Sequence, residues 1–92
     1  MAGEFSTLKR RCRETGAALR KDRTVEYTEV AVDAPAGRRW SASSTHEVVF
    51  MVNTFGTAAA DYDAIARLLL PDIDGGLEAC DDGDCERCNS EI

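Results

Sequence analysis

Hydrophobic positions in this chain follow a helical spacing first, a strand-like spacing next, and a helical spacing again. The first helical stripe recurs at steps of three and four residues and consists of Phe5, Leu8, Cys12, Thr15 and Leu19. It predicts a basic helix over residues 5–21 with Cys12 facing inward, although Gly16 weakens this helix. The second stripe consists of Ala58, Tyr62, Ile65, Ala66 and Leu69. It predicts a helix over residues 57–70, capped by Thr57 and ended by Pro71.

Between these helices, residues 24–55 have the composition of β-strands. The segment Thr24 to Asp33 is rich in Val, Thr and Tyr, and the sequence from Ala34 to Gly37 has proline and glycine where a type I turn favours them. These signals predict a hairpin in which Asp33 lies opposite Arg38. The same register places Ala31 opposite Trp40.

This register divides the strand residues between two faces. The face expected to lie under the helices carries Val25, Tyr27, Ala31, Trp40, Ala42, Val48, Phe50 and Val52. The opposite face turns apolar at Val49 and Met51, so the strand around Phe50 is hydrophobic on both sides. Such a strand needs cover on both faces and pairing along both edges. In the hairpin, however, Val48 has no partner.

An alternative register breaks the second strand at Ser43-Ser44-Thr45. Residues 46–55 then fold back as a third strand, which lies at an edge of the sheet. In either case we expect another chain, or another copy, to complete the sheet or to cover Val49 and Met51. The fold class is therefore α+β: a small antiparallel sheet, either a hairpin or a three-stranded meander, with two flanking helices in the order α-β-β-(β)-α.

The chain of 92 residues is expected to form a single domain over residues 1–92, with a core that is marginal by itself. Its charge is segregated, because residues 9–23 hold seven basic and two acidic residues and residues 71–92 form an acidic tail rich in cysteine. Arg10, Arg11 and Arg13 are expected to meet an acidic tail, and two solvated faces are the alternative. We do not expect nucleic-acid binding, because the net charge of −6 repels phosphate.

Composition also bears on where the protein acts. No run of residues is long and apolar enough for a membrane span, and the first residues lack the features of a signal peptide. We expect a soluble protein of the cytoplasm, or of a particle assembled in the cytoplasm. The acidic, lysine-poor composition resembles that of salt-adapted proteins or of products of GC-rich genomes.

The cysteines of the tail are the candidate metal ligands. Cys85 and Cys88 are separated by two residues, as in many zinc sites, and Cys80 lies within reach as a third ligand. We expect Cys12 to supply the fourth ligand of a structural zinc ion, and His46 or a nearby aspartate are the alternatives.

The tail also resembles the cluster loop of plant-type ferredoxins. Cys80, Gly83, Cys85 and Cys88 match its C-x4-C-x2-C spacing, and this resemblance implies a [2Fe-2S] centre in an electron carrier. The family's fourth cysteine lies downstream of the third, and no cysteine follows Cys88 in this sequence. Disulfides, between Cys85 and Cys88 or between Cys80 and Cys12, and a free acidic tail are further alternatives.

Features of a catalytic site are sparse. His46 is the sole histidine, and no acid or nucleophile motif accompanies it. The sequence therefore favours a non-enzymatic assembly protein, a subunit or accessory component repeated in a larger complex, of which a virus-particle connector is one instance. Its expected contact residues are Val49, Met51, Phe55, Arg10, Arg11 and Arg13. An intracellular zinc-binding adaptor or regulator is the alternative.

Overall fold

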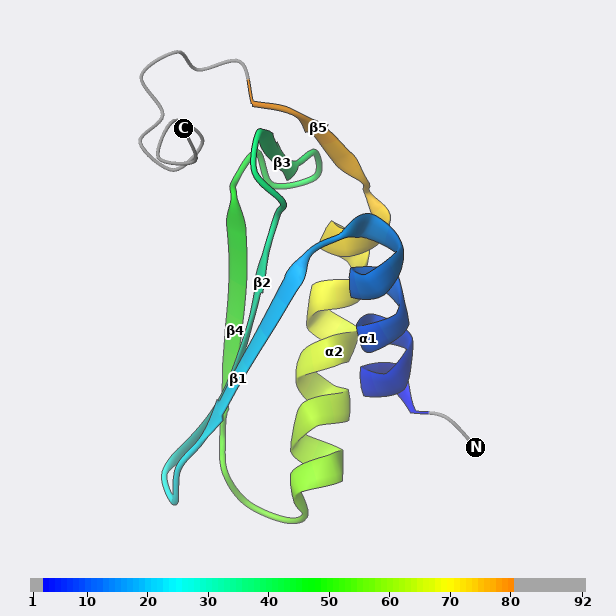
Figure 1. The fold of residues 1–92 in the computed structure, drawn as a ribbon. Coiled ribbons are helices and arrows are strands. Elements are labelled where there is room, and N and C mark those ends of the chain that lie inside the picture. The colour runs from blue at the N-terminus through cyan, green and yellow to red at the C-terminus, as the bar shows by residue number, and fades with distance from the viewer. Residues whose placement is uncertain (1–2, 81–92) are drawn as a thin grey trace.

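The computed structural model describes residues 3–80 and shows an α+β fold (Figure 1). A helix precedes a three-stranded antiparallel sheet, a second helix packs on one face of that sheet, and a small two-stranded sheet lies at one end. This architecture confirms the fold class predicted from the hydrophobic pattern. The predicted single domain over 1–92 includes residues 1–2 and 81–92, which lie outside the described residues.

The first helix, α1, spans Glu4–Thr15 and is shorter than the predicted helix over 5–21. Leu8 and Cys12 are buried, as their spacing indicates. The helix ends because Gly16 adopts a left-handed conformation with φ of 81°, and the N–H of Ala17 donates to the carbonyl of Cys12. This is the Schellman pattern that stops helices at glycine.

The residues that follow Gly16 form strand β1, Ala18–Arg23, which the sequence analysis wrongly assigned to the helix. Strand β1 pairs with β2, Tyr27–Asp33, and β2 pairs on its other side with β4, Glu47–Asn53. The strand order is β1-β2-β4, and all pairs are antiparallel. The apolar strand therefore lies at an edge of the sheet, as in the three-stranded alternative.

The predicted hairpin register is wrong, because Asp33 lies opposite Glu47 and not opposite Arg38. The hydrogen-bonded turn runs from Pro35 to Arg38, one residue later than expected, and Gly37 takes a φ of 81° within it. The chain leaves the sheet at this turn and returns at β4. Val48 therefore pairs with Val32, whereas the predicted hairpin left Val48 without a partner.

The register decides which strand residues face the helices. Val48, Phe50 and Val52 pack toward the core, as predicted, together with Thr28, Val30 and Val32 of β2. The prediction is wrong for Tyr27 and Ala31, because odd-numbered residues of β2 point to the opposite, outer face. Val25, also expected on the core face, is instead 93% exposed in the turn between β1 and β2.

The second helix, α2, spans Ala58–Asp74, and Thr57 caps it by accepting a hydrogen bond from the N–H of Ala60. Pro71 does not end the helix as expected. It lies in the last turn, where its missing N–H removes one hydrogen bond, and the helix continues because Ile73 is buried one turn after Leu69. Helix α2 packs on β2 and β4, and α1 packs beside α2.

Part of the predicted tail over 71–92 is regular structure. After α2, residues Leu77–Ala79 form β5, which pairs with β3, Arg38–Trp40, as a two-stranded sheet. Trp40 is fully buried, and its indole N–H donates to the carbonyl of Val32 at 3.3 Å. The small sheet is thus anchored to the main core through one tryptophan.

Candidate functional site

Strand β4 presents an apolar edge of the sheet. Backbone hydrogen bonds join Ala34 to His46 and Thr54 to Glu26 at the two ends of the β2–β4 ladder. Hydrogen-bonded pairs alternate along an antiparallel ladder, so even-numbered β4 residues bond to β2. Odd-numbered residues, including Val49 and Met51, therefore direct their N–H and C=O groups away from β2, toward the edge at which no strand of residues 3–80 pairs with β4.

The side chains of Val49 and Met51 are also exposed. They lie on the outer face of the sheet, 42% and 58% exposed, because both helices cover the other face. No other part of residues 3–80 covers these two side chains fully, and their contact with a partner stays a prediction. From Val48 to Val52 no charged residue interrupts the strand.

The opposite edge of the sheet differs in character. Strand β1 reads Ala-Leu-Arg-Lys-Asp-Arg, so four of its six residues carry charge. Charged side chains on an edge strand discourage pairing with other strands. The two edge strands therefore differ in charge. Four charged residues of β1 discourage pairing with another strand, whereas residues 48–52 of β4 carry no charge.

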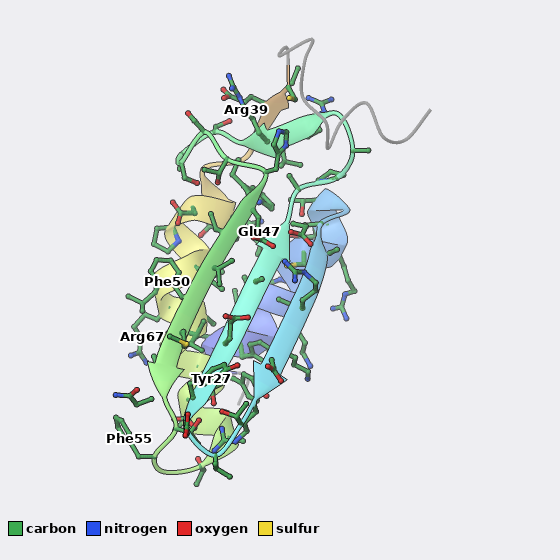
Figure 2. The ribbon with its side chains drawn as sticks, turned by 90° about the vertical axis from the view of Figure 1, so that its left-hand side faces the viewer. Tyr27, Arg39, Glu47, Phe50, Phe55 and Arg67 are labelled. Carbon is green, nitrogen blue, oxygen red and sulfur yellow. The ribbon has the colours of Figure 1, made fainter. Side chains whose placement is uncertain are left out.

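Polar side chains flank the apolar patch on the outer face (Figure 2). Arg20 of β1 forms ion pairs with Asp33, at 2.9 Å, and with Glu47, which links all three strands at one end. Tyr27 lies toward the other end, where its hydroxyl donates to Asp22 at 3.5 Å. The Asp22 carboxylate raises the pKa of Tyr27. Between these contacts lie Val49, opposite Ala31, and Met51, opposite Glu29, so the apolar part of the outer face is centred on β4.

Phe55, the third apolar residue predicted to contact a partner, lies in the connection from β4 to α2 and is 74% exposed. The turn that carries Val25 lies next to this connection, because the N–H of Thr54 donates to Glu26. Two exposed hydrophobic residues therefore occupy neighbouring loops. Because residues 24–33 have the composition of a strand, the sequence does not reveal that Val25 lies in an exposed turn.

The predicted basic contact residues lie on α1. Arg10 and Arg13 are exposed, whereas Arg11 pairs with Asp74 of α2 at 2.8 Å and with Glu14 at 3.1 Å. Arg11 therefore meets acidic groups of its own chain. Most acidic residues of the predicted tail lie outside the described residues, so its expected contact with these arginines remains a prediction.

The four predicted metal ligands have different positions. Cys12 is buried on α1 within the core, and this burial raises the pKa of its thiol. Cys80 follows β5 and is half-buried, while Cys85 and Cys88 lie outside the described residues. Within residues 3–80, no three His, Cys, Asp or Glu side chains gather in a metal-binding group.

Cys80 instead contacts the sole histidine of the chain. Its Sγ lies 3.4 Å from Nε2 of His46, and the other ring nitrogen, Nδ1, lies 2.9 Å from the carbonyl oxygen of Arg38. The backbone of Cys80 is held as well, because its N–H donates to Gly37 at 2.8 Å. The structure thus brings together Cys80 and His46, the alternative ligand of the sequence analysis.

A polar cluster that the sequence analysis did not identify closes the opposite end of the sheet. Asp61 of α2 is buried and accepts a hydrogen bond from Arg23 at 2.6 Å, and Arg23 also donates to Thr28. Thr28 in turn shares a hydrogen bond with Thr54. Every buried side-chain nitrogen and oxygen in the described part of the chain has a partner, which indicates a structural role for this cluster.

Comparison of the chain with protein-family models, with curated proteins and with solved structures finds no match in any of the three. Neither helix within residues 3–80 has the length and hydropathy needed to cross a bilayer.

Proposed function

We propose that this chain is a non-enzymatic assembly subunit that pairs with a second copy of itself through strand β4. The observation that carries the proposal is the edge of β4, which no strand within residues 3–80 pairs with and where Val49 and Met51 expose both their side chains and their outward backbone groups. Unpaired strand edges bind other strands by continuing the sheet. A second copy is the favoured occupant because β4 is complementary to itself.

The complementarity follows from the register. Two β4 strands that pair antiparallel about Phe50 would place Val49 opposite Met51 of the second copy. Both residues direct backbone groups outward, so this would be a hydrogen-bonded pair, and Phe50 would meet its own counterpart in a non-hydrogen-bonded pair. All five residues from Val48 to Val52 would then face apolar partners. Shifting the register by two residues would place Met51 opposite Glu47 in one direction and Val49 opposite Asn53 in the other.

The surroundings of β4 support the same arrangement. Helix α2 packs on β4, and its Leu68 is exposed, which adds apolar surface on the helix nearest this edge. Pairing about β4 would continue the three-stranded sheet into six strands, with the helices of both copies on the same side. The exposed Phe55 follows β4 directly and would lie at the end of the joined strands.

Such a subunit would act in the cytoplasm or in a particle assembled there, and a virus-particle connector or accessory protein is one instance. Its partners would be protein chains, not nucleic acid or membrane. The net charge of −6 supports the exclusion of nucleic acid, because phosphate groups would be repelled.

The oligomeric state of the purified chain tests the proposal. Light scattering coupled to size-exclusion chromatography should give twice the chain mass of 10.0 kDa. Met51→Glu should shift the protein toward the monomer, since it would bring a carboxylate into the apolar centre of the paired strands. Val25→Glu is the matched control, because Val25 is exposed but belongs to the turn between β1 and β2 and not to strand β4.

A backbone variant separates strand pairing from simple hydrophobic contact. Val49→Pro removes one outward N–H, and an edge strand tolerates proline where the N–H points away from the sheet. It should weaken the dimer while circular dichroism reports a folded chain. A wild-type protein that remains monomeric at every concentration, or a dimer that Met51→Glu and Val49→Pro leave intact, would overturn the proposal.

A further inference from the structure

Three separate segments meet beside the small β3–β5 sheet. Cys80 follows β5, Arg38 begins β3, and His46 precedes β4. Backbone hydrogen bonds hold two of these segments, because the N–H of Cys80 donates to Gly37 and the N–H of Ala34 donates to His46. Cys80 and His46, which are far apart in sequence, are therefore held next to each other by backbone pairing.

The side chains of these two residues are in contact. Sγ of Cys80 lies 3.4 Å from Nε2 of His46, within reach of a hydrogen bond from the thiol to the ring nitrogen. Both residues are half-buried, so the pair is held by the fold without being enclosed by it. Cys12, the other cysteine that the structure describes, is buried in the core. The two thiols within residues 3–80 thus have different surroundings.

A second contact of His46 determines which ring nitrogen carries its proton. Nδ1 lies 2.9 Å from the carbonyl oxygen of Arg38. A carbonyl oxygen can only accept a hydrogen bond, so the proton of the neutral ring lies on Nδ1. The lone pair then lies on Nε2, the atom that faces Sγ of Cys80. The ring is therefore oriented to accept the thiol proton.

This arrangement is the one that activates cysteine nucleophiles. The thiolate, and not the thiol, attacks electrophilic sulfur, so a thiol reacts faster when a base beside it takes its proton. The usual geometry has the base within hydrogen-bond reach of the nucleophile and a third group that orients the base. His46 has the position of the base, and the carbonyl of Arg38 has the position of the orienting group.

From this geometry we infer that Cys80 is a modification site, an activated thiol that forms a mixed disulfide with small-molecule disulfides and uses His46 as its base. The S–H bond of Cys80 breaks and its proton passes to Nε2. Sγ forms a bond to one sulfur of the small disulfide, whose own S–S bond breaks, and the second sulfur leaves as a thiolate that takes up the proton. Cys80 is oxidised, and the released half of the small disulfide is reduced to a thiol.

The reaction modifies the chain once and is reversed by an excess of thiol. It consumes one small disulfide for each modified chain and involves no turnover, so it is compatible with a non-enzymatic subunit. The adduct would lie where β5 ends, next to the segment that precedes β4. The inference does not depend on pairing through β4.

The rate of disulfide formation at each cysteine tests the inference. Cys85→Ser and Cys88→Ser are introduced together in a parent protein, which leaves Cys12 and Cys80 to react. The reduced, chelator-treated parent is mixed with bis-hydroxyethyl disulfide, a small neutral probe, and peptide mass spectrometry measures the adduct at each site over time. Cys80 should react faster than Cys12, and dithiothreitol should remove the adduct.

His46→Asn separates activation from simple exposure of the thiol. The asparagine amide can still donate to the carbonyl of Arg38, but it offers no base at the position of Nε2. The reaction at Cys80 should slow at least about tenfold, less than the roughly hundredfold or greater contribution of a positioned base in enzymes. His46→Gln brings an amide toward Sγ and should slow the reaction as well, because an amide does not take up the thiol proton.

Cys12 is the internal control. Its rate should be the same in the parent and in both His46 variants, and circular dichroism shows whether each variant is folded. Equal rates at Cys80 in the parent and in a folded His46 variant would show that His46 does not activate the thiol and would overturn the inference. A Cys80 thiol that reacts no faster than Cys12 in the parent would overturn it too.

Discussion

Arg23 of β1 and Asp61 of α2 form an ion pair with 2.6 Å between Nη1 and Oδ2, and the aspartate is buried. This contact joins the charged edge of the sheet to the first turn of the second helix. Removing Asp61 would leave the Arg23 guanidinium, whose side chain is 28% exposed, without its ion-pair partner. Asp61→Ala should therefore lower the free energy of unfolding by about 2–3 kcal/mol, less than the loss of about 3–5 kcal/mol for fully buried pairs, because Arg23 is only partly buried. Urea denaturation followed by circular dichroism measures this free energy of unfolding.

The matched control for this pair is Asp74→Ala. Asp74 pairs with Arg11 at a similar distance of 2.8 Å, but both side chains are exposed. Exposed ion pairs contribute about 0–1 kcal/mol, so the control should change stability little. Equal losses in the two variants would show that burial of Asp61 does not determine the strength of its contact.

Gly16 provides a second prediction, because it stops α1 with a φ of 81°. A Cβ at this position would meet no neighbouring atom, so the effect of substitution comes from the backbone alone. Gly16→Ala should lower the free energy of unfolding by about 1 kcal/mol, the cost of the left-handed conformation for an L-residue. Thermal denaturation gives the measurement. Ser6→Ala on the exposed face of α1 is the control, and a loss equal to that of Gly16→Ala would contradict this explanation.

The two described cysteines should differ in reactivity. Cys12 is buried and burial raises the pKa of its thiol, whereas Cys80 is half-buried. Because the thiolate is the reactive form, a raised pKa leaves less of it near neutral pH, and the rate should increase as the pH rises toward that pKa. Brief treatment of metal-free protein with a maleimide, followed by peptide mass spectrometry, should label Cys80 before Cys12. Equal labelling would contradict the burial of Cys12.

Trp40 is the single tryptophan of the chain and provides a fluorescent probe of the small sheet. Its side chain is fully buried and its indole donates to Val32. We expect a blue-shifted emission and weak quenching by acrylamide. Trp40→Phe should lower stability through the lost hydrogen bond, about 1 kcal/mol, and the void left by the smaller ring. Strong quenching in the native protein would contradict the position of Trp40 in the core.

Several features of the fold follow from local sequence. Side chains alternate along a strand, so the opposite orientations of Phe50 and Val49 can be predicted without knowledge of the partner strand. The helix cap at Thr57 can also be predicted from the residues next to it, because its bond partner, Ala60, lies only three residues away. The end of α1 is harder to predict, because Leu19 fits both a helical stripe and a strand position opposite Val32. The left-handed conformation of Gly16 decides between them.

Other features depend on pairing between distant segments. The ladder between β2 and β4 forms because residues 34–46 leave the sheet, and a turn signal at Pro35 does not reveal where the chain returns. The contact between Cys80 and His46 likewise joins residues 34 positions apart. The sequence alone does not indicate this contact, because it depends on the pairing of β3 with β5 that positions Cys80.

The inequality of the two sheet edges would also limit the size of an assembly. Two copies joined through β4 would use both unprotected edges, and each outer margin of the resulting six-stranded sheet would be a charged β1 strand. A two-fold contact of this kind closes on itself, whereas head-to-tail addition would extend without limit. The charges of β1 would thus prevent growth into a fibre.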